Sequence, residues 1–260
     1  MLLKYFSLCL LLPLAACSVL PDSGKQADAG VGVDANAWTL TPLQPGVAPA
    51  STSAPLWQHY PLPGKQASEF AYTRLDGRHA MAAHANASAS LLRQAVHIPP
   101  PALGSVKFSW KVPALIAQAD MAQRELDDSP VRIVLTFDGD RSRFSARNAM
   151  LSELSHTIAG EPLPYATLMY VWCNTRAPGA VIVNPRTDRI RKLVVESGGK
   201  NLNQWLDYER DIRADFEAAF GEPPGALLGI GIMTDSDNTR ATAVAWYGLV
   251  RLSPALLAKK

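Results

Sequence analysis

The sequence predicts a mainly β fold: a β-sandwich resembling a jelly roll, with two short helices, preceded by a flexible tether. Three observations favour this class: many short apolar runs bounded by turn residues, apolar/polar alternation within them, and no regular exchange of strands with helices. Residues 113–128 fit either a loop or a helix. We expect strands over residues 69–75, 80–85, 90–98, 106–112, 131–137, 167–173, 180–184, 190–196, 204–208, 227–234 and 241–252.

Residues 106–112 show the alternation most clearly. One face is apolar and the other polar: Val106, Phe108, Trp110 and Val112 against Lys107, Ser109 and Lys111. A period of two is typical of a strand with one buried face and one solvated face. The pattern predicts that Trp110 packs in the core, and the apolar run around Trp172 predicts the same for that residue.

Residues 227–250 contain two apolar runs separated by a polar turn, Asp-Ser-Asp-Asn at 235–238. Asp and Asn favour tight turns because their side chains bond to nearby backbone groups. The pattern predicts a β-hairpin within one sheet.

A first helix is predicted after Ser145, which is a favoured N-cap residue. Met150, Leu154 and Ile158 then recur every four residues, and Gly160 is placed to end the helix.

A second helix is predicted to begin at Asp211. Ile212, Phe216 and Phe220 form one stripe, and Gly221 followed by two prolines ends the helix.

The first residues are typical of an export signal. Residues 1–16 carry one charge, Lys4, followed by a short apolar run, and the Leu-Ala-Ala-Cys junction resembles a bacterial lipobox. This resemblance implies that Cys17 is acylated and serves as a membrane anchor; an ordinary signal peptide is the alternative. Ser18 at the next position favours the outer membrane, facing the periplasm.

The composition divides the rest of the chain into three parts. Residues 17–55 are rich in Pro, Ala, Gly and Ser, and as a flexible coil this tether would span roughly 30–35 Å. Residues 56–253 are expected to form a single β-sandwich domain, and 254–260 a short tail. Cys173 has no other cysteine to pair with in this domain and is expected to be a buried thiol.

The overall composition is that of an ordinary globular protein, with 48% hydrophobic and 18% charged residues. The net charge of +2 falls to about +1 when Lys4 leaves with the leader. A nearly neutral chain lacks the basic patch that nucleic-acid binding requires, so this class of function is excluded.

The acidic turn offers oxygen ligands for a cation. Asp235, Asp237 and Asn238 could hold a structural calcium ion, and Asp127 and Asp128 could add ligands if the fold brings them near. The spacing is not that of an EF-hand loop, because the sixth and twelfth positions lack the required Gly and Glu. A plain turn stabilised by its own side chains is the alternative.

Aromatic residues suggest a ligand site. Trp205 lies among polar residues, with Tyr208 and Arg210 nearby, and these three could contact a sugar by stacking and hydrogen bonding. Packing inside the domain is the alternative. Carboxylates suited to a glycosidase are present, but their spacing is not diagnostic, and no zinc-binding or nucleophile-elbow motif occurs.

Several runs together resemble a bacterial family of secreted and lipid-anchored proteins of unknown function, over roughly residues 56–252. They are VKFSWKV at 106–112, DDSPVRIVLTF at 127–137, TLMYVW at 167–172, Trp205, ERD at 209–211, DF at 215–216, FG at 220–221, IMTDSDNT at 232–239 and YG at 247–248.

The resemblance brings no catalytic residues, and its strand order is similar to galactose-binding-like jelly-roll modules, which is an analogy of fold. We expect a non-catalytic module that binds an envelope glycan or another partner. A hydrolase acting on an envelope polysaccharide and a purely structural lipoprotein remain alternatives.

Overall fold

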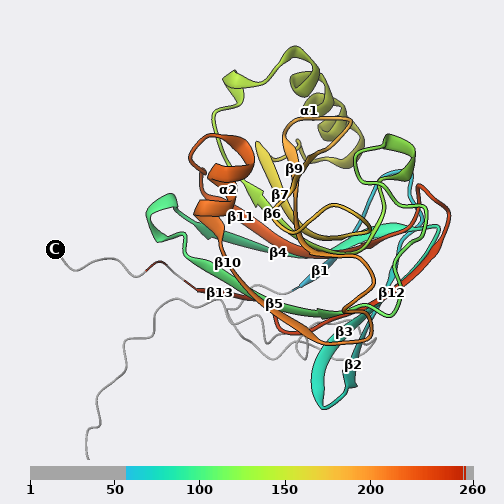
Figure 1. Cartoon of the computed structure of the whole chain (residues 1–260). Coiled ribbons are helices and arrows are strands. Elements are labelled where there is room, and N and C mark those ends of the chain that lie inside the picture. Colours follow the sequence, from blue (N-terminus) through green and yellow to red (C-terminus); the bar gives the residue numbers. More distant parts are fainter. Residues whose placement is uncertain (1–56, 254, 256–260) are drawn as a thin grey trace, which may run out of the picture. The chain divides into compact units, whose positions relative to one another are not determined.

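The computed structural model describes residues 57–253 and residue 255. The predicted leader, Cys17, the tether and most of the tail lie outside these residues. Two β-sheets and two α-helices make up the described part (Figure 1). The strands are β1 (Gln58–Pro61), β2 (Glu69–Leu75), β3 (Arg78–Asn86), β4 (Ala89–Ile98), β5 (Ser105–Lys111), β6 (Ser129–Phe137), β7 (Ala166–Cys173), β8 (Val181–Val183), β9 (Ile190–Ser197), β10 (Leu206–Asp211), β11 (Leu227–Asp235), β12 (Thr242–Tyr247) and β13 (Arg251–Ser253). The helices are α1 (Ala146–Ala159) and α2 (Ile212–Phe220), with short 3-10 helices at Pro100–Ala102, Arg124–Leu126 and Arg141–Arg143.

The two sheets form a β-sandwich, which confirms the predicted fold class. The seven-stranded sheet has the order β1-β4-β11-β6-β7-β9-β8, and the six-stranded sheet has the order β10-β5-β12-β3-β2 with β13 also paired to β5. Neighbouring strands are antiparallel except for β7 and β9, which are parallel.

The hairpin predicted over residues 227–250 is wrong. β11 pairs with β4 and β6 in the seven-stranded sheet, whereas β12 pairs with β3 and β5 in the six-stranded sheet. The acidic turn therefore carries the chain from one sheet to the other. The two apolar runs look like a hairpin in sequence because both are buried, but sequence pattern alone does not reveal which strands pair.

Aromatic rings fill the space between the sheets. Phe108 and Trp110 of β5 meet Tyr170 and Trp172 of β7, with ring centroids 5.6 Å apart for Phe108–Tyr170 and 6.5 Å for Trp110–Trp172. Both tryptophans are fully buried, as predicted from their strand patterns. Cys173 is a buried free thiol, also as predicted.

Helix α1 has the predicted ends. The Ser145 hydroxyl accepts a hydrogen bond from the Asn148 backbone N–H, and Gly160 adopts a left-handed conformation with φ of 76°. A glycine tolerates this conformation without the steric cost that a Cβ would bring.

The apolar stripe of α1 nevertheless faces outward. Met150, Leu154 and Ile158 are 64%, 51% and 60% exposed. The helix packs instead through Asn148 and Ser152, and Asn148 hydrogen bonds to the residues preceding β9. The four-residue spacing predicted the helix, but polar contacts decide its orientation.

Helix α2 also begins and ends as predicted, with Asp211 as its N-cap and Gly221 in a left-handed conformation. Its Phe216 packs on Phe137 of β6, with ring centroids 4.7 Å apart. Residues 113–128, which fitted either a loop or a helix, form a loop with one short 3-10 turn. No helix among the described residues is long and apolar enough to cross a bilayer.

Candidate functional site

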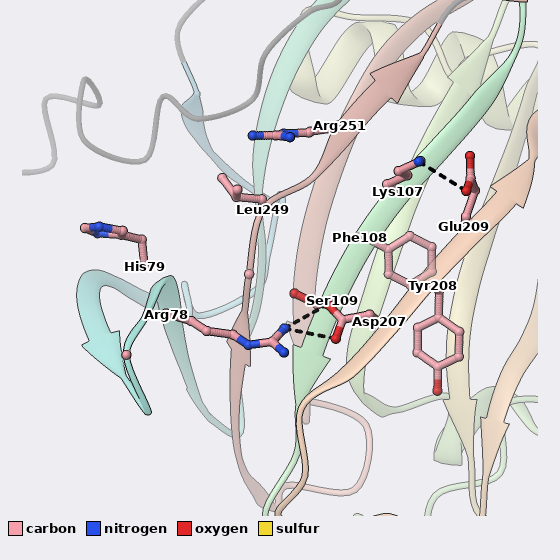
Figure 2. Close-up of a pocket in the computed structure, with 12 residues that line it drawn as sticks. Arg78, His79, Lys107, Phe108, Ser109, Asp207, Tyr208, Glu209, Leu249 and Arg251 are labelled. Atoms are coloured by element: carbon pink, nitrogen blue, oxygen red, sulfur yellow. Dashed lines mark hydrogen bonds and ion pairs between the residues drawn. The ribbon is translucent and has the colours of Figure 1, made fainter.

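An open groove of about 840 Å³ lies on the outer face of the six-stranded sheet (Figure 2). Strands β5 and β10 form its floor, the β2–β3 turn forms one wall, and the segment between β12 and β13 forms another. Its lining residues are Gly77, Arg78, His79, Lys107, Phe108, Ser109, Asp207, Tyr208, Glu209, Gly248, Leu249 and Arg251.

Strand alternation places the polar side chains on the groove floor. Asp207 of β10 is paired in register with Ser109 of β5, and Glu209 with Lys107. The Lys107 ammonium lies 3.2 Å from a Glu209 carboxylate oxygen, and Ser105 donates a hydrogen bond of 3.0 Å to the same carboxylate. Phe108 and Tyr208, between these residues in sequence, also belong to the lining, but their side chains alternate toward the opposite face, where the two rings stack on each other.

A tight turn positions the charged residue of the opposite wall. Asp76 and Gly77 both have positive φ, 51° and 77°, and connect β2 to β3. Asp-Gly is favoured in two-residue hairpin turns because both positions require left-handed backbone conformations. The turn directs Arg78 toward Asp207, to which its guanidinium donates two hydrogen bonds of 2.7 and 3.0 Å (Figure 2).

Trp205 lies at one end of the groove. The Arg78 guanidinium is 5.4 Å from the centroid of the Trp205 ring. A Cβ added to Gly248 would lie 3.5 Å from the same ring, so the indole borders the groove wall at Gly248. Arg78 thus partly covers an aromatic surface that is half buried.

The groove carries a slight excess of positive charge. Three cationic side chains, Arg78, Lys107 and Arg251, line it together with the carboxylates Asp207 and Glu209. The pKa of Glu209 is lowered because Ser105 and Lys107 hydrogen bond to its ionised form. At neutral pH this carboxyl group is a carboxylate that accepts hydrogen bonds and has no proton to donate.

The three residues predicted to contact a ligand do not converge. Trp205 borders the groove. The Tyr208 ring stacks on Phe108 at 5.4 Å, and its hydroxyl donates a hydrogen bond of 2.8 Å to Glu196. Arg210 is bound to Asp215 of α2 through two hydrogen bonds of 2.5 and 2.9 Å. The Tyr208 hydroxyl and the Arg210 guanidinium, which is 37% exposed, are therefore both engaged by carboxylates outside the groove, and the ligand role of these two residues stays a prediction.

A second group of polar residues surrounds the acidic turn between β11 and β12. One carboxylate oxygen from each of Asp128, Asp235 and Asp237 lies within 4.8 Å of the others. Asp128 also accepts hydrogen bonds from the backbone N–H groups of Asn238 and Thr239, at 3.1 and 2.7 Å. The sequence did not determine whether Asp127 and Asp128 lie near the acidic turn. The fold brings this pair to the turn.

Buried charges extend from this cluster into the sandwich. Arg132 of β6 lies 3.1 Å from both Asp127 and Asp235, and Lys192 of β9 lies 2.6 Å from Asp127. Burial raises the pKa of Asp235 to about 7, against the opposing effect of Arg132. Burial also lowers the pKa of Lys192 to about 8. Carboxylate-rich, oxygen-only surroundings suit a hard cation such as calcium.

Sequence reasoning missed most of the groove residues. The alternation in 106–112 identified Lys107 and Ser109 as belonging to a solvated face. Nothing in the local pattern indicated that Arg78 and Arg251 would join them. Strand β13 pairs with β5, and β3 joins the same sheet through β12, and both pairings link residues far apart in the sequence.

These observations define the class of the protein: a two-sheet β-sandwich with a polar groove on one outer face. Residues 55–251 match the family model described as "Protein of unknown function (DUF3047)", and the chain belongs to this family. One similar solved structure is the xyloglucanase domain of NopAA, a type three effector from Sinorhizobium fredii, in complex with cellobiose. It has a TM-score of 0.39 and 8% sequence identity, over 79% of this chain and 96% of that chain. The comparison with curated protein sequences finds no match.

Proposed function

We propose that this chain is a lipid-anchored periplasmic protein whose β-sandwich binds an envelope glycan, without catalysis, in the groove over β5 and β10. The observation that carries the proposal is the composition of this groove. Two ion pairs, Arg78–Asp207 and Lys107–Glu209, lie on one open face, and Trp205 borders them beneath Arg78.

The groove provides the two kinds of contact that sugars need. Charged side chains with several donors and acceptors can bind adjacent hydroxyl groups, and an indole face can stack on the apolar face of a sugar ring. The ion pairs are exposed, with Arg78 and Asp207 side chains 43% and 63% accessible, so a ligand can exchange partners with them at modest cost.

The same geometry argues against a glycosidase. A hydrolase of this kind requires one carboxyl group with a raised pKa to protonate the leaving group. Both carboxylates that line the groove are ion-paired, and the pKa of Glu209 is lowered rather than raised. Asp235, whose pKa is raised, belongs to the cluster of Asp128, Asp235 and Asp237, here called the acidic cluster, and does not line the groove.

The proposed location rests on the start of the chain. The lipobox-like junction at Cys17 supports acylation, and Ser18 supports sorting to the outer membrane. A tether of this composition would let the domain reach roughly 30–35 Å from the bilayer. Replacing Cys17 with serine is expected to release the protein from the membrane fraction; unchanged membrane attachment would contradict lipid anchoring at this residue.

Titration of the full-length protein, purified in detergent, with a panel of envelope polysaccharide fragments tests the glycan proposal. We expect one glycan class to bind, with affinity reduced at least about tenfold in Trp205→Ala and in Arg78→Ala, the scale of one lost stacking or charge-assisted contact. Glu69→Gln, on β2 of the same sheet but outside the groove, is the matched control.

Three results would contradict the proposal. Binding that survives both groove substitutions would place the ligand elsewhere. Absence of binding by any glycan would favour a structural role or a protein partner. New reducing ends released from a bound polysaccharide would show a hydrolase instead.

A further inference from the structure

The acidic cluster of Asp128, Asp235 and Asp237 contains a buried carboxylate oxygen that no donor group of the described residues reaches. Asp235 is only 5% exposed, and its Oδ2 lies 3.1 Å from Arg132. Its Oδ1 is buried and accepts no hydrogen bond from the described residues. An unsatisfied buried carboxylate oxygen is costly, and a bound cation is one of the groups that can satisfy it.

The neighbouring oxygens are of the type that a hard cation prefers. Asp128 and Asp237 place carboxylate oxygens within 4.8 Å of the Asp235 carboxylate. Calcium binds through six to eight oxygen atoms, including carboxylates, carbonyls and water. No histidine or cysteine belongs to this cluster in the described residues, so its donors match calcium better than zinc.

The charges of the network do not balance. It contains four carboxylates and three cationic groups: Asp127, Asp128, Asp235 and Asp237 against Lys65, Arg132 and Lys192. With every group ionised, one negative charge is left over in a largely buried site. Such an imbalance is unfavourable in surroundings of low dielectric constant.

Lys65 differs from the other two cations. The side chains of Arg132 and Lys192 are 3% and 0% exposed, whereas that of Lys65 is 31% exposed and contacts Asp237 from the turn between β1 and β2. Lys65 can therefore move into solvent without uncovering the core. A divalent ion in its place would bring the network to neutrality.

We propose that Asp128, Asp235 and Asp237 bind a calcium ion, which displaces the Lys65 ammonium group from Asp237. Asp128 also holds the backbone of the turn through Asn238 and Thr239. The ion thus joins the start of β6 to the connection between β11 and β12, and it stabilises the crossing from one sheet to the other. The site involves none of the groove residues and is independent of glycan binding.

Calorimetric titration and thermal unfolding of the full-length protein, first treated with chelator, test this site. Calcium is expected to bind, to raise the unfolding temperature reversibly, and to do both better than magnesium. Asp235→Asn combined with Asp237→Asn should weaken binding at least about tenfold, because two charged ligands are lost. Lys65→Met should bind calcium severalfold more tightly, because the competing ammonium group is gone. Glu69→Gln serves as control.

Absence of calcium binding at about 10 mM, above the dissociation constants of about 0.1–1 mM of weak extracellular sites, would overturn the proposal. Equal binding by the double variant would move the site elsewhere. If the double variant does not fold, Lys65→Met decides: calcium affinity that is unchanged or weaker would refute the displacement.

Discussion

Replacing Gly248 with alanine is expected to destabilise the domain, because Ser109 on the groove floor leaves no room for a methyl group at this position of the wall. A Cβ at this position would lie 2.1 Å from the Ser109 hydroxyl oxygen and 3.4 Å from the Ser109 Cβ. Ser109 is only 6% exposed, so its side chain must shift within a packed environment. Overpacking of this kind typically costs about 1–3 kcal/mol, and for a domain of this size it lowers Tm by about 3–10 °C.

The structure also supplies a rescuing substitution. Ser109→Ala removes the clashing oxygen and leaves contacts of 3.4 Å to the Cβ of residue 109 and 3.5 Å to the Trp205 ring, so the double variant should recover most of the lost stability. Circular dichroism of the full-length protein during thermal unfolding measures both effects. A Gly248→Ala variant as stable as the wild type, or a double variant no better than the single one, would refute the packing described for the groove floor.

Three further substitutions test other parts of the structure. Asp120→Asn should cost about 1–2 kcal/mol at neutral pH, because Arg176 and neighbouring donors lower the pKa of this carboxyl group to about 2 from 3.8. The stabilisation by ionised Asp120 is present above pH 3.8 and is lost as the pH falls through about 2. The unfolding free energies of the wild type and the variant, measured by chemical unfolding, should therefore converge near pH 2. A difference that stays constant with pH would contradict this role of Asp120. Lys192→Met should lower the free energy of unfolding, measured in urea, by about 3 kcal/mol or more. The reason is that the buried Asp127 carboxylate loses the ammonium group 2.6 Å away. A loss under about 1 kcal/mol would contradict the role of this ion pair. Gly225→Ala should cost at least about 3 kcal/mol, since its Cβ would lie 2.1 Å from a backbone carbonyl oxygen that no side-chain rotation can relieve. Normal stability of this last variant would show that the backbone there can move.

Local signals in the sequence predicted the helix ends. Ser145 and Asp211 cap the two helices, and Gly160 and Gly221 end them. These predictions succeed because a cap depends on residues within one turn of each other.

Predictions that depended on distant contacts were less successful. The runs on either side of the acidic turn are both strands, but they belong to different sheets. The stripe at Met150, Leu154 and Ile158 is helical but exposed. Strand partners and helix orientation are set by the whole packing arrangement, which a single periodic segment does not encode.

The candidate sites, too, were predicted only in part, because local sequence does not determine which side chains meet in space. Trp205 was selected for its polar neighbours and does border the groove. Tyr208 and Arg210 were selected for the same reason, but their polar groups bind Glu196 and Asp215 instead. Strand alternation explains this difference in part, because Tyr208 and Arg210 share one face of β10 and Asp207 and Glu209 the other. Arg78 could not be found from sequence, since its contact with Asp207 of β10 joins residues 129 positions apart in the chain.

Hydrogen–deuterium exchange of the full-length protein, with and without its best-binding glycan, tests the central claim most directly. If the glycan binds in the groove, backbone amides should exchange more slowly with the glycan than without it in peptides that cover residues 76–79, 107–109, 205–209 and 248–251. Protection confined to these four segments would support a glycan site on the outer face of the six-stranded sheet. Protection confined to the seven-stranded sheet, with these segments unchanged, would contradict it.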